Sequence, residues 1–478
     1  MTITLSSLVY AITVGILFYT LRGELRVPLL TLASVGYAFF LNRKAGFILL
    51  ITILLTWLIG LLIGTLRRKN RRKALFAVTG IGVALAALTL VLLKYLPGIL
   101  EGRGVTEGPF VRLIVPIGFS FYIFQTISYF TDLSRGDAAP MRNPFHLALY
   151  LAWFPRFISG PIERANPFAE ELNGIMRVRL RDAQRWKQVL HFLTIGVFMK
   201  LVIADRLGIV VDYLFEHHIG FGATFLLLGI LFYTIQIYCD FAGYSYVALG
   251  LSLAFGIRLT ENFLMPYCSA NITEFWRRWH RSLSTWLKDY LYIPLGGNRL
   301  GTGRKILNTM IVFVICGAWH GYGWTFIIWG ALHGVYSAVD ALFREKGIRW
   351  IRSGISGRIL TFLAVAFAWI FFRADSLATV KGYLQTMAEQ GLRLHSFAAE
   401  AEVLHLGPVE WSVIALSVLT VLLLDAFAYR KRMSVPKMTA QMRPVFRYIL
   451  LFVLLSATII FGMYGPAYDS NPMIYMQF

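Results

Sequence analysis

Apolar segments of membrane-spanning length recur along most of this chain, and they restrict its fold more than any other feature. A helix that crosses a bilayer needs about 20 mostly apolar residues. With 57% hydrophobic and only 15% charged residues, the chain is far too apolar for an ordinary soluble protein. We therefore predict an all-α, polytopic membrane protein with about 11–13 membrane-embedded helices, some of them re-entrant or interfacial. The apolar segments lie near residues 3–21, 27–41, 46–66, 74–96, 110–131, 189–215, 223–254, 306–320, 322–343, 358–372, 411–428 and 445–463.

No polar linker long enough to separate two domains interrupts these segments, so we predict a single domain over residues 1–478. Within it we distinguish N-terminal helices at 1–109, a central core at 110–375, and a polar loop with C-terminal helices at 376–478. The polar loop covers about 376–410 and is expected to lie outside the membrane.

Positive charge dominates the polar residues and indicates the orientation of the chain. Lys and Arg number 46 against 25 Asp and Glu, a net charge of +21. In a membrane protein such an excess is typical of cytoplasmic loops beside anionic lipid, and nucleic acid is not an expected partner. Residues 67–73 read RRKNRRK, so we predict that this loop is cytoplasmic and, by alternation, that the N-terminus lies outside. The first apolar segment lacks a signal-peptide pattern and is expected to remain as a membrane helix.

Residues 144–162 are apolar, but Pro155, Arg156, Gly160 and Pro161 would interrupt a helix exposed to lipid. Basic segments flank this stretch on both sides. A re-entrant hairpin buried in protein fits both observations, because broken backbone at membrane depth is tolerated only where protein or a cavity surrounds it. An ordinary kinked span is the alternative.

Charged residues also occur inside the apolar segments that follow. Lys200 and Asp205 are five residues apart, so on an α-helix they would approach each other only loosely. Asp240 lies in the next segment and is a candidate site residue. Such groups face the protein interior or a wet cavity, in structural ion pairs or in a functional site.

The stretch from Asn271 to Tyr290 has helical periodicity and an unusual density of aromatic and cationic residues. Asn271 followed by Glu274 resembles a capping box, and an aromatic and aliphatic stripe runs along one face. This predicted helix is too charged to span the membrane and is expected to lie at its interface or to wall a funnel. His280 lies beside the stripe. It is either part of a site or a hydrogen-bonded residue of an interfacial anchor.

His320 ends an apolar run and is followed by two nearby glycines, which we expect to leave room for a ligand. A neutral imidazole in an apolar setting is a plausible general base, because its unperturbed pKa is about 6.5 and burial lowers it. A packing histidine is the alternative reading. His333 lies inside a predicted helix and is interpreted as structural.

The chain shows no sign of a metal site, and common enzyme motifs are missing. Cys239, Cys268 and Cys316 are widely spaced and form no CxxC or CxxH pattern. There is no GxSxG, HExxH or phosphate-binding loop motif, which excludes the common serine hydrolases, zinc proteases and nucleotide-binding proteins.

The sequence resembles the membrane-bound O-acyltransferase family, and within it the alginate O-acetyltransferase branch. The resemblance extends through RRWH (277–280), GAWHG (317–321) and several further segments between about 110 and 375. It implies membrane-embedded helices around a central tunnel, with His320 as the essential histidine and His280 as the second histidine of the site. Residues expected to line the tunnel or the donor side are Trp276, Arg277, Arg278, Trp279, Ser284, Lys288, Trp319 and Asp240. Tyr246 and Arg281 depart from the family's usual pattern, which argues against transferring a precise substrate.

The resemblance implies acyl transfer across a bacterial inner membrane. A cytoplasmic thioester, either acetyl-CoA or an acyl carrier protein, would donate an acetyl group, and no bound cofactor is expected. The acceptor would be an exported polysaccharide, or an extracytoplasmic acetyltransferase of the SGNH type that works with the polysaccharide export machinery. We hypothesise that His320 is the general base, that His280 orients the thioester carbonyl, and that Arg277, Arg278 and Lys288 attract donor phosphate.

Two other functions fit parts of the sequence. One is a D-alanyl transferase of the DltB type, which takes its acyl group from a carrier protein. The other is a proton-coupled transporter, in which His280, His320, Asp205 and Asp240 would relay protons, although no inverted repeat supports it.

Overall fold

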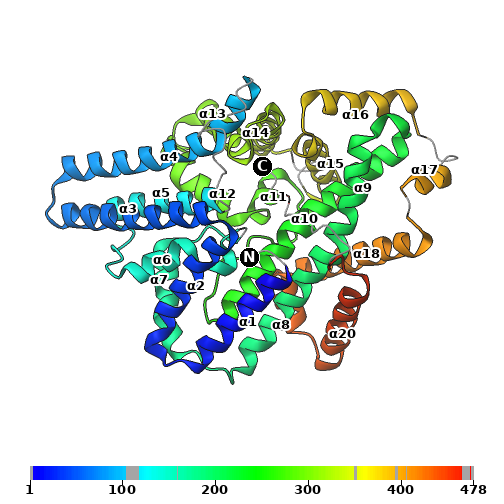
Figure 1. Cartoon of the computed structure of the whole chain (residues 1–478). Helices are drawn as coiled ribbons and strands as arrows, with labels where there is room; N and C mark the ends of the chain where they lie inside the picture. The colour runs from blue at the N-terminus through cyan, green and yellow to red at the C-terminus, as the bar shows by residue number, and fades with distance from the viewer. Residues whose placement is uncertain are drawn as a thin grey trace. The chain divides into compact units, whose positions relative to one another are not determined.

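A computed structural model describes residues 4–103, 118–158, 160–348, 353–392, 397–404, 406–465 and 474. All regular secondary structure in these residues is helical, without a strand (Figure 1). Among the described residues, eight helices are long and apolar enough to cross a membrane, and Ser6–Thr20 is a shorter apolar helix. The predicted all-α, polytopic membrane architecture is confirmed. The eight helices are Gly23–Leu41, Arg43–Arg68, Arg72–Leu100, Ala223–Ala254, Trp324–Glu345, Gly354–Arg373, Pro408–Lys431 and Pro444–Phe461.

The residues group into two compact units, 1–190 with 247–260 and 191–246 with 261–478. The predicted single domain stays a prediction. Two long helices, α8 (Ala183–Phe198) and α10 (Ala223–Ala254), contribute to both units. The other helices of the first unit are α1 (Leu5–Thr20), α2 (Arg26–Leu41), α3 (Arg43–Arg68), α4 (Arg72–Gly102), α5 (Phe119–Arg135), α6 (Pro144–Ala152) and α7 (Ala165–Gly174).

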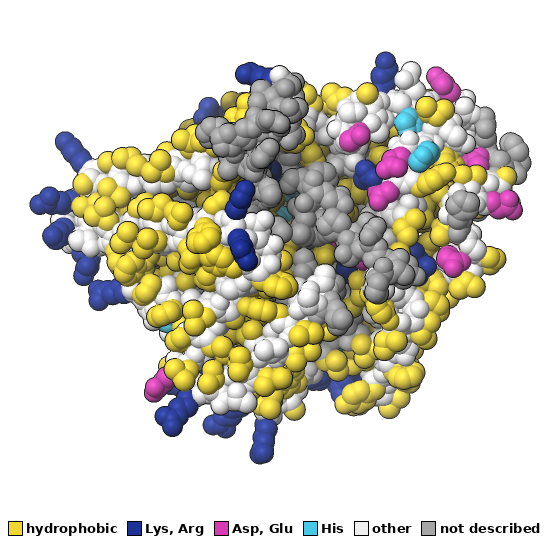
Figure 2. Space-filling model, viewed as in Figure 1, with side chains coloured by type: hydrophobic (Ala, Val, Ile, Leu, Met, Phe, Trp, Pro, Cys, Tyr) yellow, Lys and Arg dark blue, Asp and Glu magenta, His cyan; other side chains and the backbone are white. Residues whose placement is uncertain are grey.

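In the first unit, α3, α4 and α5 pack side by side (Figure 1). Only 33% of the most apolar window of α3 and 11% of that of α4 are buried, so most of their apolar side chains face outward, as contact with lipid requires. The cationic segment 67–73 turns between α3 and α4, with Asn70 at φ 50°, and Lys and Arg side chains gather at this end of the hairpin (Figure 2). Its cytoplasmic location stays a prediction.

The interrupted segment 144–162 contains α6, which has nine residues and ends at Ala152. A nine-residue helix rises about 14 Å, less than half of the thickness of the hydrocarbon layer. A 3₁₀ turn, Phe154–Arg156, follows it. Arg156 is buried with its guanidinium 4.5 Å from the Phe168 ring, and it donates to the Tyr150 carbonyl. This short, buried and broken helix favours the re-entrant interpretation over a continuous kinked span.

The second unit contains the remaining helices and the motif-rich part of the chain. Its helices beyond the shared pair are α9 (Asp205–Glu216), α11 (Ile272–Arg278), α12 (Arg281–Leu287), α13 (Gly301–His320), α14 (Trp324–Glu345), α15 (Gly354–Arg373), α16 (Leu377–Gln390), α17 (Phe397–Val403), α18 (Pro408–Lys431), α19 (Val435–Ala440) and α20 (Pro444–Phe461). The predicted polar loop 376–410 thus contains α16 and α17. His395 and His405 lie outside the described residues.

Lys200 and Asp205 form a close ion pair, and the prediction that they approach only loosely is wrong. The Lys200 Nζ atom lies 2.6 Å from an Asp205 carboxylate oxygen and 2.7 Å from an Asp240 carboxylate oxygen. Residues Met199–Ala204 form a π-helix between α8 and α9. Its i→i+5 hydrogen-bonding pattern brings side chains five residues apart onto one face, which an α-helix does not do.

Candidate active site

The continuous helix predicted from Asn271 past Tyr290, over 271–292, is wrong, because the chain breaks at His280. The helix α11 ends at Arg278 and α12 begins at Arg281, while His280 has φ 40° and ψ 54° in the left-handed region. A residue other than glycine in this region costs about 1–3 kcal/mol, so surrounding contacts must hold it there. The aromatic stripe continues through the break, so the sequence periodicity did not reveal it.

Hydrogen bonds on both sides of His280 hold this bend. Asn262 is buried, its carbonyl accepts from the Arg281 N–H at 3.0 Å, and its side-chain oxygen accepts from the Ser282 N–H at 3.2 Å. On the other side, the Leu264 N–H donates to the Arg278 carbonyl at 3.0 Å. The segment 262–264 therefore replaces the helical hydrogen bonds that the break removes.

The capping prediction at the start of α11 is confirmed. The Asn271 side chain accepts from the Glu274 N–H at 2.9 Å, and Glu274 accepts from the Ala270 N–H at 2.8 Å. Glu274 also pairs with Arg278 at 2.9 Å, one turn further along the helix. These contacts fix the first turn and thereby the direction of the chain toward His280.

The His280 imidazole is buried and neutral. Only 1% of the residue is exposed, and its ring centroid lies 4.7 Å from that of Phe241 in an edge-to-face arrangement. Burial lowers the pKa of His280 to about 3, because the surrounding rings do not solvate an imidazolium. At neutral pH the ring is therefore uncharged, and it can donate one hydrogen bond and accept another.

His320 is the last residue of α13 and is 4% exposed. Its ring lies 4.8 Å from Trp319, 5.1 Å from Trp329 and 5.2 Å from Phe372, measured between centroids. The expectation that Gly321 leaves room for a ligand is wrong, because a Cβ atom there would lie 2.3 Å from the Phe326 ring. Gly321 instead lets the Phe326 ring pack against the end of α13.

Close packing of α13 on α14 positions His320 beside Trp329. A Cβ atom at Gly330 would lie 2.3 Å from the Phe313 carbonyl oxygen, so a glycine is needed for the two backbones to approach. Trp329 is fully buried and also contacts Trp369 in a stacked arrangement with 5.7 Å between centroids. His320 therefore lies in a rigid aromatic enclosure.

His280 and His320 come together at Trp319. The His280 and Trp319 ring centroids are 6.4 Å apart, and those of Trp319 and His320 are 4.8 Å apart. The two histidines that the resemblance selected thus share one aromatic neighbour, although they arrive on different elements. A buried pair of imidazoles beside apolar walls is suited to proton transfer at a reacting group.

His333 shares a different aromatic neighbour with His320, because its ring centroid lies 4.9 Å from that of Trp329, which lies 5.1 Å from that of His320. It is fully buried, its Nδ1 atom accepts from the Trp276 indole N–H at 3.3 Å, and its ring stacks on Phe275 with 6.1 Å between centroids. Trp276 is thus placed against His333. The interpretation of His333 as a structural residue stays a prediction.

The remaining predicted tunnel residues have varied surroundings. Trp279 is buried and stacks on Phe275 at 5.6 Å between centroids, and the Ser284 hydroxyl donates to the Trp279 carbonyl at 3.3 Å. Asp240 accepts from Lys200 and, at 2.8 Å, from the backbone N–H of Ile474. Asp240 therefore belongs to a buried ion cluster, and its assignment to the tunnel stays a prediction.

A polar cavity of about 950 Å³ opens beside α11. Arg277 and Arg278 line it, as expected of donor-side residues, whereas Lys288 does not. Lys288 is 59% exposed and pairs with Asp289 at 3.5 Å. The other polar and charged residues of this cavity, which we call the arginine cavity, are Asn271, Thr273, Glu274, Arg281, Arg344, Tyr429, Arg430 and Arg432.

The arginine cavity carries a large excess of positive charge. Among the described residues that line it, Glu274 carries the one carboxylate, and this carboxylate forms an ion pair with Arg278. Within the described part of the chain, Arg277, Arg430 and Arg432 make no ion pair within 4 Å. Such a cavity is suited to an anion with several charges, because guanidinium groups bind phosphate oxygens in pairs.

Sequence reasoning missed Arg344, Arg430 and Arg432, which come from α14 and the end of α18. The run Arg430–Lys431–Arg432 was visible in the sequence, but nothing in it indicated proximity to α11. It also missed Asp425, a buried carboxylate of α18 that accepts from the Tyr238 hydroxyl at 3.1 Å. A charged residue within an apolar segment was the signal that would have found it.

Comparison with known proteins identifies the family. The model of the membrane-bound O-acyltransferase family matches residues 138–379, which include both histidines. A probable alginate O-acetylase AlgI from Pseudomonas putida is 37% identical over 376 residues, which cover 75% of this chain and 74% of that protein.

Two further relatives widen the range of acyl groups and acceptors. A peptidoglycan O-acetyltransferase from Helicobacter pylori is 33% identical, over 80% of this chain and 79% of that protein. A teichoic acid D-alanyltransferase from Bacillus subtilis is 26% identical, over 74% of this chain and 96% of that protein. With apolar helices of membrane-spanning length, two buried histidines and these matches, the chain belongs to the membrane-bound O-acyltransferase family, and it is an acyltransferase.

Proposed function

We propose that this acyltransferase moves an acetyl group from a cytoplasmic thioester across the membrane to an exported polysaccharide, or to a partner acetyltransferase that acetylates it. The meeting of His280 and His320 at Trp319 carries this proposal. The named activities of the alginate and peptidoglycan relatives support acetate as the acyl group and a cell-envelope polymer as the final acceptor. We place the enzyme in a bacterial inner membrane, with the N-terminus outside and residues 67–73 cytoplasmic.

In the proposed reaction, His320 accepts the proton of the acceptor hydroxyl as its oxygen attacks the thioester carbonyl carbon. The C–S bond then breaks, an ester forms, and the proton passes to the thiolate that leaves. His280 donates a hydrogen bond to the carbonyl oxygen as negative charge develops there. General base catalysis of this kind contributes about 10²–10⁴-fold to a rate. A general base of this kind must begin the reaction as a neutral imidazole, which can take up a proton.

The arginine cavity is the proposed donor site. Its unpaired Arg277, Arg430 and Arg432 favour a donor whose phosphate groups carry several negative charges, as coenzyme A does. A carrier protein's phosphopantetheine arm has a single phosphate and would use fewer of these arginines. We therefore favour acetyl-CoA over an acyl carrier protein, and we assign no donor role to Lys288, which does not line the cavity.

Proposed partners follow from the final acceptor. An extracytoplasmic acetyltransferase of the SGNH type would receive the acetyl group, and the polysaccharide export machinery would supply the polymer. D-alanyl transfer of the DltB type is the second candidate function, and the Bacillus subtilis relative favours it. Family membership argues against the proton-coupled transporter.

The test is the amount of O-acetyl ester on the exported polysaccharide of cells that carry His320→Ala. The matched control is His217→Ala, because His217 is an exposed histidine far along the chain from the site. We expect His320→Ala to lose the ester at normal protein level and the control to keep it. Unchanged acetylation in His320→Ala would contradict acyl transfer through this site, and D-alanyl ester in place of acetyl ester would support the second candidate.

A further inference from the structure

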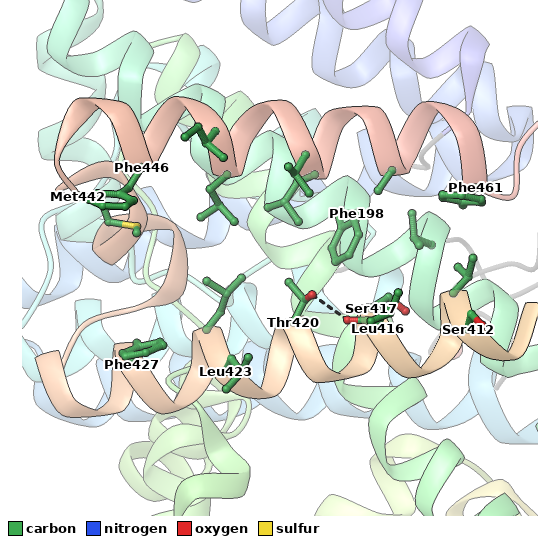
Figure 3. A pocket seen from close by; sticks show the side chains of 18 of the residues that line it. Phe198, Ser412, Leu416, Ser417, Thr420, Leu423, Phe427, Met442, Phe446 and Phe461 are labelled. Atoms are coloured by element: carbon green, nitrogen blue, oxygen red, sulfur yellow. Dashed lines mark hydrogen bonds between the residues drawn. The ribbon is translucent and has the colours of Figure 1, made fainter. Parts of the chain in front are cut away.

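A long apolar groove lies between α18 and α20 in the second unit. Its cavity volume is about 1120 Å³, and side chains of both helices point into it, with Phe198 between them (Figure 3). Val202 also lines the groove. The labelled residues run from Ser412 and Phe461 at one end to Phe427, Met442 and Phe446 at the other (Figure 3). Nothing in the proposed acyl transfer uses this groove.

The walls of the groove are hydrocarbon in character, and its few hydroxyls are largely satisfied. The Thr420 hydroxyl donates to the Leu416 carbonyl at 2.7 Å, and the Ser412 and Ser417 hydroxyls donate to backbone carbonyls of their own helix. The apolar side chains nevertheless remain open, with Leu416 66% and Ile449 57% exposed. Because α18 and α20 are of membrane-spanning length, these open apolar walls are suited to hydrocarbon chains of lipid.

Among the described residues that line the groove, the charged ones lie together at one end. Arg430 and Lys431, in the last turn of α18, are exposed lining residues next to Phe427, and no acidic residue lines the groove. Among the described residues, neither cation has an ion-pair partner within 4 Å. An apolar groove that ends in two cations is complementary to a molecule with long hydrocarbon chains and an anionic head.

A membrane helix of a partner protein fits this groove less well. A helix that followed α18 from end to end would be about 36 Å long and 10 Å wide, and it would fill about 2800 Å³. That volume is more than twice the volume of the cavity. Helix pairs in membranes also approach through small residues, whereas Leu, Phe, Val, Ile and Met dominate these walls.

We propose that the groove between α18 and α20 binds an anionic phospholipid, with its acyl chains along the groove and its headgroup phosphate at Arg430 and Lys431. This site lies next to the proposed donor site and shares one lining residue with it. Arg430 also lines the arginine cavity, so the test relies on Lys431, which lines only the groove.

The experiment is native mass spectrometry of the full-length protein purified in detergent and mixed with equal amounts of dioleoyl phosphatidylglycerol and dioleoyl phosphatidylcholine. We expect the wild-type protein to retain phosphatidylglycerol preferentially. Lys431→Gln should lower that preference about fivefold, because each cation near a membrane surface contributes about that factor. The matched control is Lys69→Gln, an exposed cation at the end of α3, which should leave this preference unchanged.

A second variant tests the apolar part of the groove without changing its charge. Leu423→Trp should fill the groove and reduce the retention of both lipids, while an excess of inorganic phosphate should displace neither. Equal retention of the two lipids by wild-type protein, or equal behaviour of Lys431→Gln and Lys69→Gln, would overturn the proposal. Displacement by phosphate, full retention in Leu423→Trp, or a co-purified membrane peptide that excludes lipid would also overturn it.

Discussion

The His280 ring lies 6.4 Å from the ring of Trp319, and the same indole packs against His320 at 4.8 Å. The left-handed backbone at His280 turns this residue out of the helical path, and its ring then lies near Trp319, which also contacts His320. Backbone strain therefore lies at a residue of the proposed site, as is common in enzyme active sites.

The imidazole of His280 should be needed for activity rather than for folding. Asparagine tolerates the left-handed region, so His280→Asn should keep the bend and remove the ring. We expect the protein to fold and the acyl transfer rate to fall about 10²–10⁴-fold. The measurement is turnover of the purified variant together with its thermal unfolding, and His280→Gly is the control for relief of strain. A folded His280→Asn with full activity would exclude a role in proton or carbonyl chemistry.

Stability should fall in acid because His280 is buried in its neutral form. Its pKa in the folded protein is about 3, against about 6.5 in the unfolded chain. Between these values the unfolded chain binds the extra proton. The contribution of His280 to stability is thus fully present above pH 6.5 and is lost as pH falls toward 3, by about 1.4 kcal/mol for each pH unit.

Unfolding of the detergent-solubilised protein between pH 4 and pH 7 measures this effect. His280→Asn, which cannot take up the proton, should show a shallower dependence on pH than the wild-type protein. Identical pH dependence in the two proteins would mean that other groups cause the acid sensitivity.

Removing one positive charge from the arginine cavity should weaken binding of the acyl donor more than it slows the chemical step. Arg277 and Arg432 line the cavity without an ion pair among the described residues, so Arg277→Gln or Arg432→Gln should raise KM for the acyl donor about tenfold. We expect kcat to change little and added salt to reduce the difference between variant and wild-type protein. Lys288→Gln is the matched control, because Lys288 is exposed and lies outside the cavity. An equal change in KM for the acyl donor in all three variants would contradict the proposal that the arginine cavity binds the donor.

Removing the cation of the buried cluster of Lys200, Asp205 and Asp240 should destabilise the protein. In Lys200→Met, two carboxylates that now lie within 2.7 Å of the ammonium nitrogen lose their counterion. Breaking a buried ion pair on one side typically costs about 3–5 kcal/mol. Thermal unfolding should report this loss, and a further Asp205→Asn substitution should restore part of it. A Lys200→Met protein as stable as wild type would contradict this expectation.

Sequence reasoning predicted the membrane helices well, because apolar length and periodicity are local properties. It failed where local geometry departs from the α-helix. The break at His280 was hidden by an aromatic stripe that continues from Phe275 to Leu283, and the pairing of Lys200 with Asp205 depends on a π-helical segment.

The candidate site was predictable only in part. His280 and His320 were selected by resemblance, but their approach at Trp319 depends on how α11, α12 and α13 pack. Likewise, Arg277 and Arg278 were visible in one motif, whereas Arg344 and Arg432 reach the same cavity from distant segments. Contacts between distant segments leave no periodic signal in the sequence.

The most direct test of acetyl transfer across the membrane uses the purified enzyme reconstituted in liposomes and labelled acetyl-CoA. Acetyl-CoA is placed on one side of the membrane, and an acceptor polysaccharide with its partner acetyltransferase is placed on the other. If the enzyme transfers acetate across the membrane through His320, wild-type protein and His217→Ala should give labelled ester on the acceptor side. His320→Ala should give none above background. Undiminished transfer by a folded His320→Ala, or transfer only when donor and acceptor share one side, would contradict acetyl transfer across the membrane through His320.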